Sequence, residues 1–225
     1  MRKTLFISSV VVSLAGCSQN SSDLMDTLGV AFGGPKENLI SQEEVDAIPY
    51  ASQYVQMDGN GQALLVLGWV ERSRANQPRL KWVSADHEMV VTQAGRVVKT
   101  TNLKQGNLLS DSSETIDPLA LGILNQDTPQ EWHHKISWMP HYHIDYQAVS
   151  HFSKLGNEQV TLPSGEVSLT HVIERVSIPT LNVEYSNHYW VRPDTSKVIY
   201  SQQYFYPNSP QMILFTGKPF MGVTQ

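Results

Sequence analysis

Two histidines on one predicted strand, His141 and His143, have a spacing that suits metal binding. Alternate residues of a strand point to the same face, so the His-x-His pair places two imidazoles together. Zinc or another divalent ion would need a third protein ligand, for which His133 and Asp145 are the candidates. A polar outer face on an amphipathic strand explains the same residues. We favour the polar face, and we expect no metal and no cofactor.

The single cysteine, Cys17, is the second position suited to chemistry. Arg2 and Lys3 precede an apolar run that ends at Leu14, a secretory signal too short to span a bilayer. A cysteine directly after small residues resembles the lipobox of bacterial lipoproteins, in which the thiol receives a diacylglyceryl group before cleavage. We predict a signal peptide over 1–16 and lipid attachment at Cys17. The alternative is a plain secretory signal with a chance cysteine.

The residue after this cysteine indicates a destination. Ser18 stands there instead of aspartate, which resembles the pattern that sorts lipoproteins of enteric bacteria to the outer membrane. Acidic residues outnumber basic ones, so acyl chains and not a polybasic surface would bind the membrane. We expect an outer-membrane lipoprotein that faces the periplasm.

Aromatic side chains offer a third chemistry, because a ring with an apolar body and a polar edge suits contact with a sugar or a protein. Every tryptophan falls within a predicted strand, where a core position is the more common role: Trp69, Trp82, Trp132, Trp138 and Trp190. Among the aromatic residues, Trp132, Trp138 and Tyr142 are the predicted contacts with a glycan or a partner protein.

Catalytic signatures give no support for an enzyme. The sequence has no G-x-S-x-G motif and no S-x-x-K motif, and helices do not alternate with strands as in an α/β-hydrolase. A glycosidase needs two placed carboxylates, which a sequence cannot pair across strands. We predict a protein without catalysis, with a periplasmic hydrolase as the weaker alternative.

Composition narrows the class further. The 225 residues are 40% apolar and 16% charged, enough for a packed core. A net charge of −5 argues against a nucleic-acid partner, which would select a basic stripe. One cysteine excludes both a disulfide framework and a cysteine-based zinc cluster.

The elements that position these residues are mostly strands. A short amphipathic helix is expected over 23–32, and a capping box, Ser41-x-x-Glu44, predicts a second short helix. Short apolar or alternating runs follow, separated by Gly, Pro, Asn and Asp. We predict a lipidated tether with short helices over 17–53. Residues 54–225 should form one antiparallel β domain of about ten strands, a curved sheet or a barrel-like fold.

Several local patterns make this prediction specific. Residues 93–95 suit a three-residue hairpin loop with glycine in the left-handed region. Residues 104–131 have little strand character and should form a segment that covers the core. Alternation over 132–146 predicts one buried aromatic face and one polar face, and Pro140 marks an edge strand or the junction of two strands. Further hairpin turns are predicted at 162–166, 185–188 and 192–197.

Six stretches, taken in order behind the lipobox, resemble the YjbF/GfcB type of lipoprotein. They are 48–52, 64–68, 82–86, 95–100 with Leu103 and Leu108, 187–191 and 201–203. The resemblance implies an all-β body at the outer membrane that acts beside the components exporting group 4 capsule or related exopolysaccharides. It implies no catalytic residue. The expected function is support of polysaccharide assembly or secretion by binding a partner protein or the polymer; a glycan-binding module and a metal-binding periplasmic protein are the alternatives.

Overall fold

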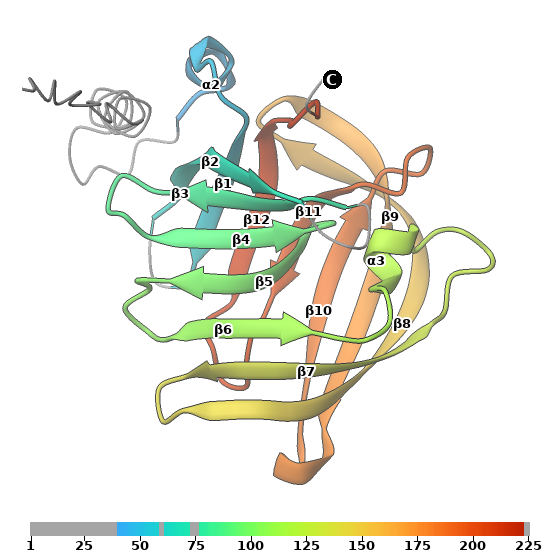
Figure 1. Cartoon of the computed structure of the whole chain (residues 1–225). Helices are drawn as coiled ribbons and strands as arrows, with labels where there is room; N and C mark the ends of the chain where they lie inside the picture. The colour runs from blue at the N-terminus through green and yellow to red at the C-terminus, as the bar shows by residue number, and fades with distance from the viewer. Residues whose placement is uncertain (1–39, 59–60, 73–76, 223–225) are drawn as a thin grey trace, which may run out of the picture. The chain divides into compact units, whose positions relative to one another are not determined.

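Twelve antiparallel strands in one sheet contain most of the residues that the computed structural model describes, which are 40–58, 61–72 and 77–222 (Figure 1). The all-β prediction is confirmed, with two strands more than expected. The strands are β1 (Ser52–Met57), β2 (Ala63–Glu71), β3 (Arg79–Val83), β4 (Met89–Gln93), β5 (Arg96–Thr101), β6 (Asn107–Ser112), β7 (Glu131–Met139), β8 (His143–Leu162), β9 (Gly165–Ile178), β10 (Val183–Val191), β11 (Val198–Gln203) and β12 (Met212–Lys218).

The sheet curls until its two edge strands meet, so it is nearly closed into a barrel. Its strand order is β5-β4-β3-β2-β1-β12-β11-β10-β9-β8-β7-β6, and Figure 1 shows β5 and β6 side by side. Side chains help to join these edges. The Thr100 hydroxyl accepts a hydrogen bond from the backbone N–H of Leu108 at 2.9 Å, and Asn107 accepts one from the backbone N–H of Leu103 at 3.1 Å. Such contacts protect edges that would otherwise be open to other chains.

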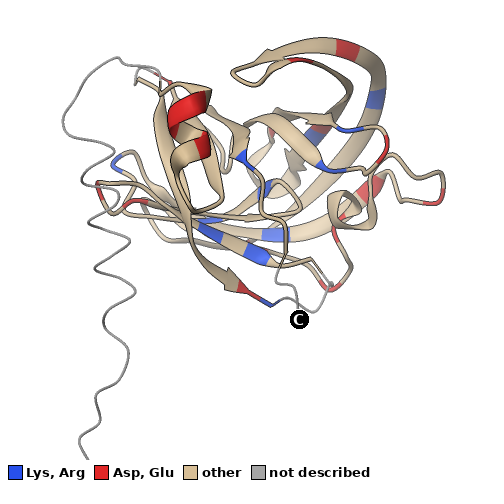
Figure 2. Ribbon diagram, turned by 90° about the horizontal axis from the view of Figure 1, so that it is seen from above, with Lys and Arg blue, Asp and Glu red and all other residues tan. Residues whose placement is uncertain are grey.

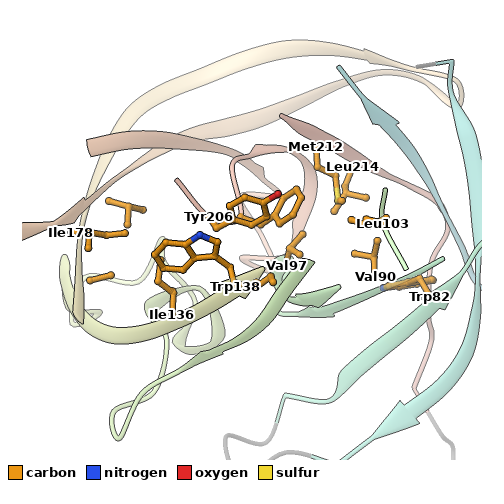
Figure 3. Packing of buried hydrophobic residues seen from close by; sticks show 14 of the residues in the cluster. Trp82, Val90, Val97, Leu103, Ile136, Trp138, Ile178, Tyr206, Met212 and Leu214 are labelled. Atoms are coloured by element: carbon orange, nitrogen blue, oxygen red, sulfur yellow. The ribbon is translucent and has the colours of Figure 1, made fainter. Parts of the chain in front are cut away.

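Inward-facing residues of these strands form the core. One buried cluster draws on strands from both halves of the sheet, and Figure 3 shows its side chains meeting in one space, among them Trp82, Val97, Ile136, Trp138, Tyr206 and Leu214. A second cluster joins Trp132, Phe152 and Tyr189 to Leu119 and Ile123. Leu119 belongs to the short helix α3 (Pro118–Leu121), so this helix covers part of the core as predicted.

The helix predicted from the capping box is confirmed as α2 (Gln42–Ala47). The Ser41 side chain accepts from the backbone N–H of Glu44, and the Glu44 carboxylate accepts from the backbone N–H of Ser41. Val45 is fully buried. The other predicted helix, over 23–32, lies outside the described residues.

Three local predictions need correction. The segment 104–131 contains an edge strand, β6. Its residues are mostly polar and do not show the alternation of apolar and polar positions that indicates a strand. Residues 185–188 lie inside β10, and the turn before that strand is a 3-10 helix, η1 (Pro179–Leu181). The β4–β5 loop has two residues instead of three, because Gln93 pairs directly with Arg96. Both loop residues have positive φ, and a Cβ atom at Gly95 would clash with Val198.

The hairpin of β8 and β9 is the longest in the sheet, and its turn at 163–164 confirms that prediction. A bulge interrupts its pairing between Lys154 and Gly156, where Gly156 has a φ of 128°. A bulge adds one unpaired residue and bends the strand. Beyond it the hairpin arches over, as Figure 2 shows from above. We call residues 157–170 the arm.

Candidate functional site

A row of aromatic rings crosses five neighbouring strands, from His171 through Trp190, Tyr200 and Phe215 to Tyr54. The register pairs each residue with the next one in the row. Successive ring centroids lie 4.3, 4.7, 6.2 and 4.7 Å apart. We call this set the aromatic row. It lies on the outer face of the sheet, because neighbours of its members, such as Tyr189 and Val191, point into the core.

Both ends of the aromatic row are covered, and its middle is partly open. Tyr54 is buried, and its hydroxyl donates to the carbonyl of Ile40, just before α2, at 3.0 Å. His171 is buried at the other end, as is its neighbour Trp190. Tyr200 and Phe215 remain half-buried between them. These two rings are therefore the members of the row with faces open to a ligand.

The arm is attached to the row through Glu158. Its carboxylate accepts a hydrogen bond from the indole N–H of Trp190 at 2.8 Å, and it lies 2.8 Å from Nδ1 of His171. His171 Nε2 lies 2.9 Å from His188 Nδ1, so one imidazole donates and the other accepts. Three strands, β8 to β10, thus meet in one polar cluster beside the rings.

This cluster shifts the protonation of its members. Hydrogen bonds from Trp190 and then His171 lower the pKa of Glu158, which stays ionised near neutral pH. Burial, and then the charge on His171, lower the pKa of His188, while Glu158 opposes that shift. The neutral form of His188 is therefore favoured, which suits an imidazole that shares a hydrogen bond with another.

A groove of about 360 Å³ lies between the arm and the outer face of the sheet. Arm residues 158–163 form one wall, and Trp190, Tyr200, Gln202 and Phe215 form the other. We call it the arm groove. It joins aromatic faces to amide, hydroxyl and carboxylate groups, a mixture typical of sites for small polar ligands.

A second set of polar residues is sealed inside the barrel around Arg96. Its guanidinium donates to Asp117 at 2.6 Å and to both oxygens of Glu174 at 2.8 and 2.9 Å. Glu174 also accepts from the side chains of Asn187 and Tyr189 at 3.0 and 2.9 Å. Burial opposes the ionised form of Glu174, but the adjacent Arg96 keeps its pKa low. The network therefore consists of fully paired charges, as burial demands.

Asp111, His134 and Ser150 are linked by hydrogen bonds in the same order as the catalytic triad of a nucleophilic hydrolase. His134 Nδ1 lies 2.7 Å from Asp111 and Nε2 lies 3.0 Å from the Ser150 hydroxyl. A nucleophile must reach its substrate, yet Ser150 has no exposed area and Trp132 stacks on His134 at 4.1 Å. The three side chains form a buried hydrogen-bond network on the opposite face of the sheet from the arm groove.

The predicted aromatic contacts are not brought together. Trp132 and Trp138 are only 5% and 4% exposed and belong to the two core clusters, so neither offers a free face at the surface. This corrects the prediction, which had placed them at a contact surface. Tyr142 is 76% exposed in the turn between β7 and β8. Pro140 begins that turn, which divides the alternating run 132–146 into two strands.

The predicted metal ligands are also dispersed. His143 stacks on Trp138 at 4.3 Å, and His141 lies in the exposed β7–β8 turn. His133 pairs with Glu131 at 2.9 Å. Asp145 accepts from the Ser137 hydroxyl. Over residues 40–58, 61–72 and 77–222, the acidic, histidine and cysteine side chains form no group of three that could hold a metal ion.

Cys17 lies outside the described residues, so its lipidation stays a prediction. In the part of the chain that the structure describes, no helix has the length and apolar character to cross a membrane.

The residues of the arm groove were largely missed from sequence. Trp190 was a candidate only as one of five tryptophans, while Glu158, Tyr200 and Phe215 were not identified. Together with Trp190 they come from four strands, and it is the register of the strands that aligns them. The available signal was the density of Tyr and Trp over 188–206.

Comparisons with known proteins agree with this architecture. The uncharacterized lipoproteins GfcB and YjbF of Escherichia coli (strain K12) are 27% and 29% identical to this chain over 202 and 196 residues. These alignments cover 89% and 87% of this chain and 91% and 88% of the two relatives. The crystal structure of the hypothetical lipoprotein YmcC from E. coli K12 has the same fold, with a TM-score of 0.75 at 24% identity. That match covers 92% of this chain and 98% of YmcC.

A family model for the "Group 4 capsule polysaccharide lipoprotein gfcB, YjbF" matches residues 25–216. This range includes every strand up to the last residues of β12. It confirms the resemblance that six short stretches had indicated. The chain belongs to the YjbF family of group 4 capsule polysaccharide lipoproteins.

Proposed function

We propose that this protein is an outer-membrane lipoprotein, anchored through Cys17, that supports assembly or secretion of a capsule or exopolysaccharide. It acts by binding a partner protein or the polymer. The observation that carries the proposal is the family match over 25–216, in which capsule polysaccharide is named. The sequence of 1–17, with its short apolar run and its single cysteine, supports the anchor.

The proposed role is non-catalytic. The three side chains arranged as in a hydrolase, Asp111, His134 and Ser150, are buried and out of reach of a substrate. The arm groove contains one carboxylate, Glu158, whereas hydrolysis of a glycoside commonly uses two. Binding, rather than bond cleavage, is the function that these groups support best.

The test is a strain that lacks the gene, grown under conditions that induce the capsule. We expect it to carry less surface polysaccharide, and we expect a plasmid copy of the wild-type gene to restore the amount. A plasmid copy with Cys17→Ala should restore little. Normal surface polysaccharide in the deletion strain would overturn the proposal.

A further inference from the structure

The two walls of the arm groove offer complementary chemistry. On the sheet side, the rings of Tyr200 and Phe215 are half-buried, and Trp190 lies 4.7 Å from Tyr200. Aromatic faces of this kind pack against the C–H faces of sugar rings, because both surfaces are apolar. A flat ligand with an apolar face would therefore be held on this wall.

Polar groups surround these rings. Gln159 and Thr161 line the groove from the exposed part of the arm, and Gln202 lies two residues after Tyr200 on β11. The Gln202 amide donates to the Tyr200 hydroxyl at 2.7 Å, which fixes the orientation of both side chains. Amides and hydroxyls can both donate and accept, so they match the hydroxyl groups at the edge of a sugar ring.

Charge narrows the ligand class. Among the described residues that line the arm groove, Glu158 is the only ionisable acid or base apart from the phenol of Tyr200, and none is a lysine or arginine. A carboxylate repels anionic sugars, which would need a cation to neutralise them. Resting on the proposed function, we propose that the arm groove binds a short uncharged segment of the polysaccharide, with sugar rings packed on Tyr200 and Phe215.

The groove is already formed before a ligand arrives. The contact of Glu158 with Trp190 holds the arm in place, and its contact with His171 adds a second attachment. Preformed walls lower the cost of ordering on binding. A volume of about 360 Å³ lies near the lower end of the range for small-molecule sites, about 300–1,000 Å³, so a short segment rather than a long chain occupies it.

The experiment uses the full chain, extracted from membranes in detergent micelles. The probes are oligosaccharides released from the surface polysaccharide of the bacterium that carries the gene, separated by anion exchange into neutral and acidic pools. Binding is followed by the fluorescence of tryptophan and by saturation-transfer NMR. We expect the neutral pool to bind and the acidic pool to bind weakly or not at all.

Three variants locate the site. Tyr200→Ala and Gln202→Ala should each weaken binding by about tenfold, the loss typical of one important contact. Gln202→Ala removes no ring, and so it keeps the test valid if Tyr200→Ala fails to fold. Ile144→Ala removes an exposed apolar side chain outside the groove lining and should bind like the wild type. Thermal unfolding of each variant verifies that it is folded.

Several results would overturn the inference: binding only by the acidic pool, no binding by either pool, or full affinity in folded Tyr200→Ala and Gln202→Ala. Loss of binding in Ile144→Ala alone would place the site beside the β7–β8 turn instead. None of these results affects the proposed function, which the deletion strain tests by itself. If the deletion strain is normal while the groove binds sugar, the proposed function fails and the groove remains a sugar site.

Discussion

Among single residues, Arg96 is notable because its charged side chain is buried in the core. It is buried between Asp117 and Glu174, and its guanidinium lies 4.7 Å from the centre of the Trp132 ring. Burial opposes the charge on Arg96, but the two carboxylates raise its pKa well above the usual value. Arg96 therefore stays charged, and its charge balances those of the two carboxylates.

Replacing Arg96 with methionine is expected to destabilise the protein by about 3–5 kcal/mol, because two buried carboxylates lose their counter-charge. Urea unfolding at neutral pH measures the change. Lys81→Met is the matched control, since Lys81 pairs with Glu71 at 2.7 Å at the surface. Exposed pairs contribute less than about 1 kcal/mol. Similar losses in the two variants would contradict a structural role for the buried charges.

His188 predicts how stability responds to acid. Its pKa is lowered in the folded state by burial and by His171, so the unfolded chain binds a proton more readily. The stability that neutral His188 contributes is complete above its usual pKa of 6.5 and is lost as the pH falls through its lowered folded value. We expect the urea concentration at the unfolding midpoint to decrease as the pH is lowered below 6.5. His188→Asn should make this decrease smaller. An identical pH profile in His188→Asn would refute this assignment.

At the scale of elements, the bulge at Gly156 determines the course of the arm. Its φ of 128° lies in a region that side chains with a Cβ atom rarely adopt, while no atom lies within 4 Å of a Cβ built there. Gly156→Ala should therefore act through backbone strain alone and cost about 1–3 kcal/mol. Faster hydrogen exchange in the arm would locate the effect.

Gly61→Ala is the control for this substitution. Gly61 also has open space around its Cβ position but does not have a positive φ. A change at such a position is expected to stay within about 0.5 kcal/mol. Equal effects at both glycines would show that the conformation of Gly156 is not what shapes the arm.

The sequence predicted correctly those elements that depend on interactions between residues close together along the chain. The capping box gave α2 because Ser41 and Glu44 satisfy each other's backbone within one turn. The turn at 163–164 followed from Pro163 and the adjacent Gly165, which both favour turns. Strand β6 was missed because four of its six residues, Asn107–Ser112, are polar, and because its pairing with β7 defines it as a strand.

The candidate site depended on information that a sequence does not contain. Glu158 and Trp190 are 32 residues apart and meet because β8 bends at its bulge. Alternation correctly placed Trp132 and Trp138 on a buried face, but it also ran through residues 140–142, which form a turn. The inward face proved to hold both the apolar core and a polar network around Arg96.

At the scale of the whole molecule, the proposed anchor and the proposed groove depend on each other. A single short groove binds a polymer weakly. After one repeat of the polymer dissociates, another can bind in its place only if the protein and the polymer stay close together. Attachment to a membrane supplies this local concentration, and acyl chains contribute about 0.8 kcal/mol for each buried methylene. Anchoring should therefore affect the amount of polysaccharide at the surface even when the groove is intact.

Cys17 is the residue through which this dependence can be tested. We expect radioactive palmitate to label the wild-type protein and to leave Cys17→Ala unlabelled in the soluble fraction, because no other thiol exists in the chain. Ser18→Asp is the control: it retains the thiol and should be labelled fully, but should fractionate with the inner membrane. Equal labelling of wild type and Cys17→Ala would exclude the anchor. If Ser18→Asp is labelled but still fractionates with the outer membrane, lipidation at Cys17 stands. The argument that Ser18 directs the protein to the outer membrane then fails.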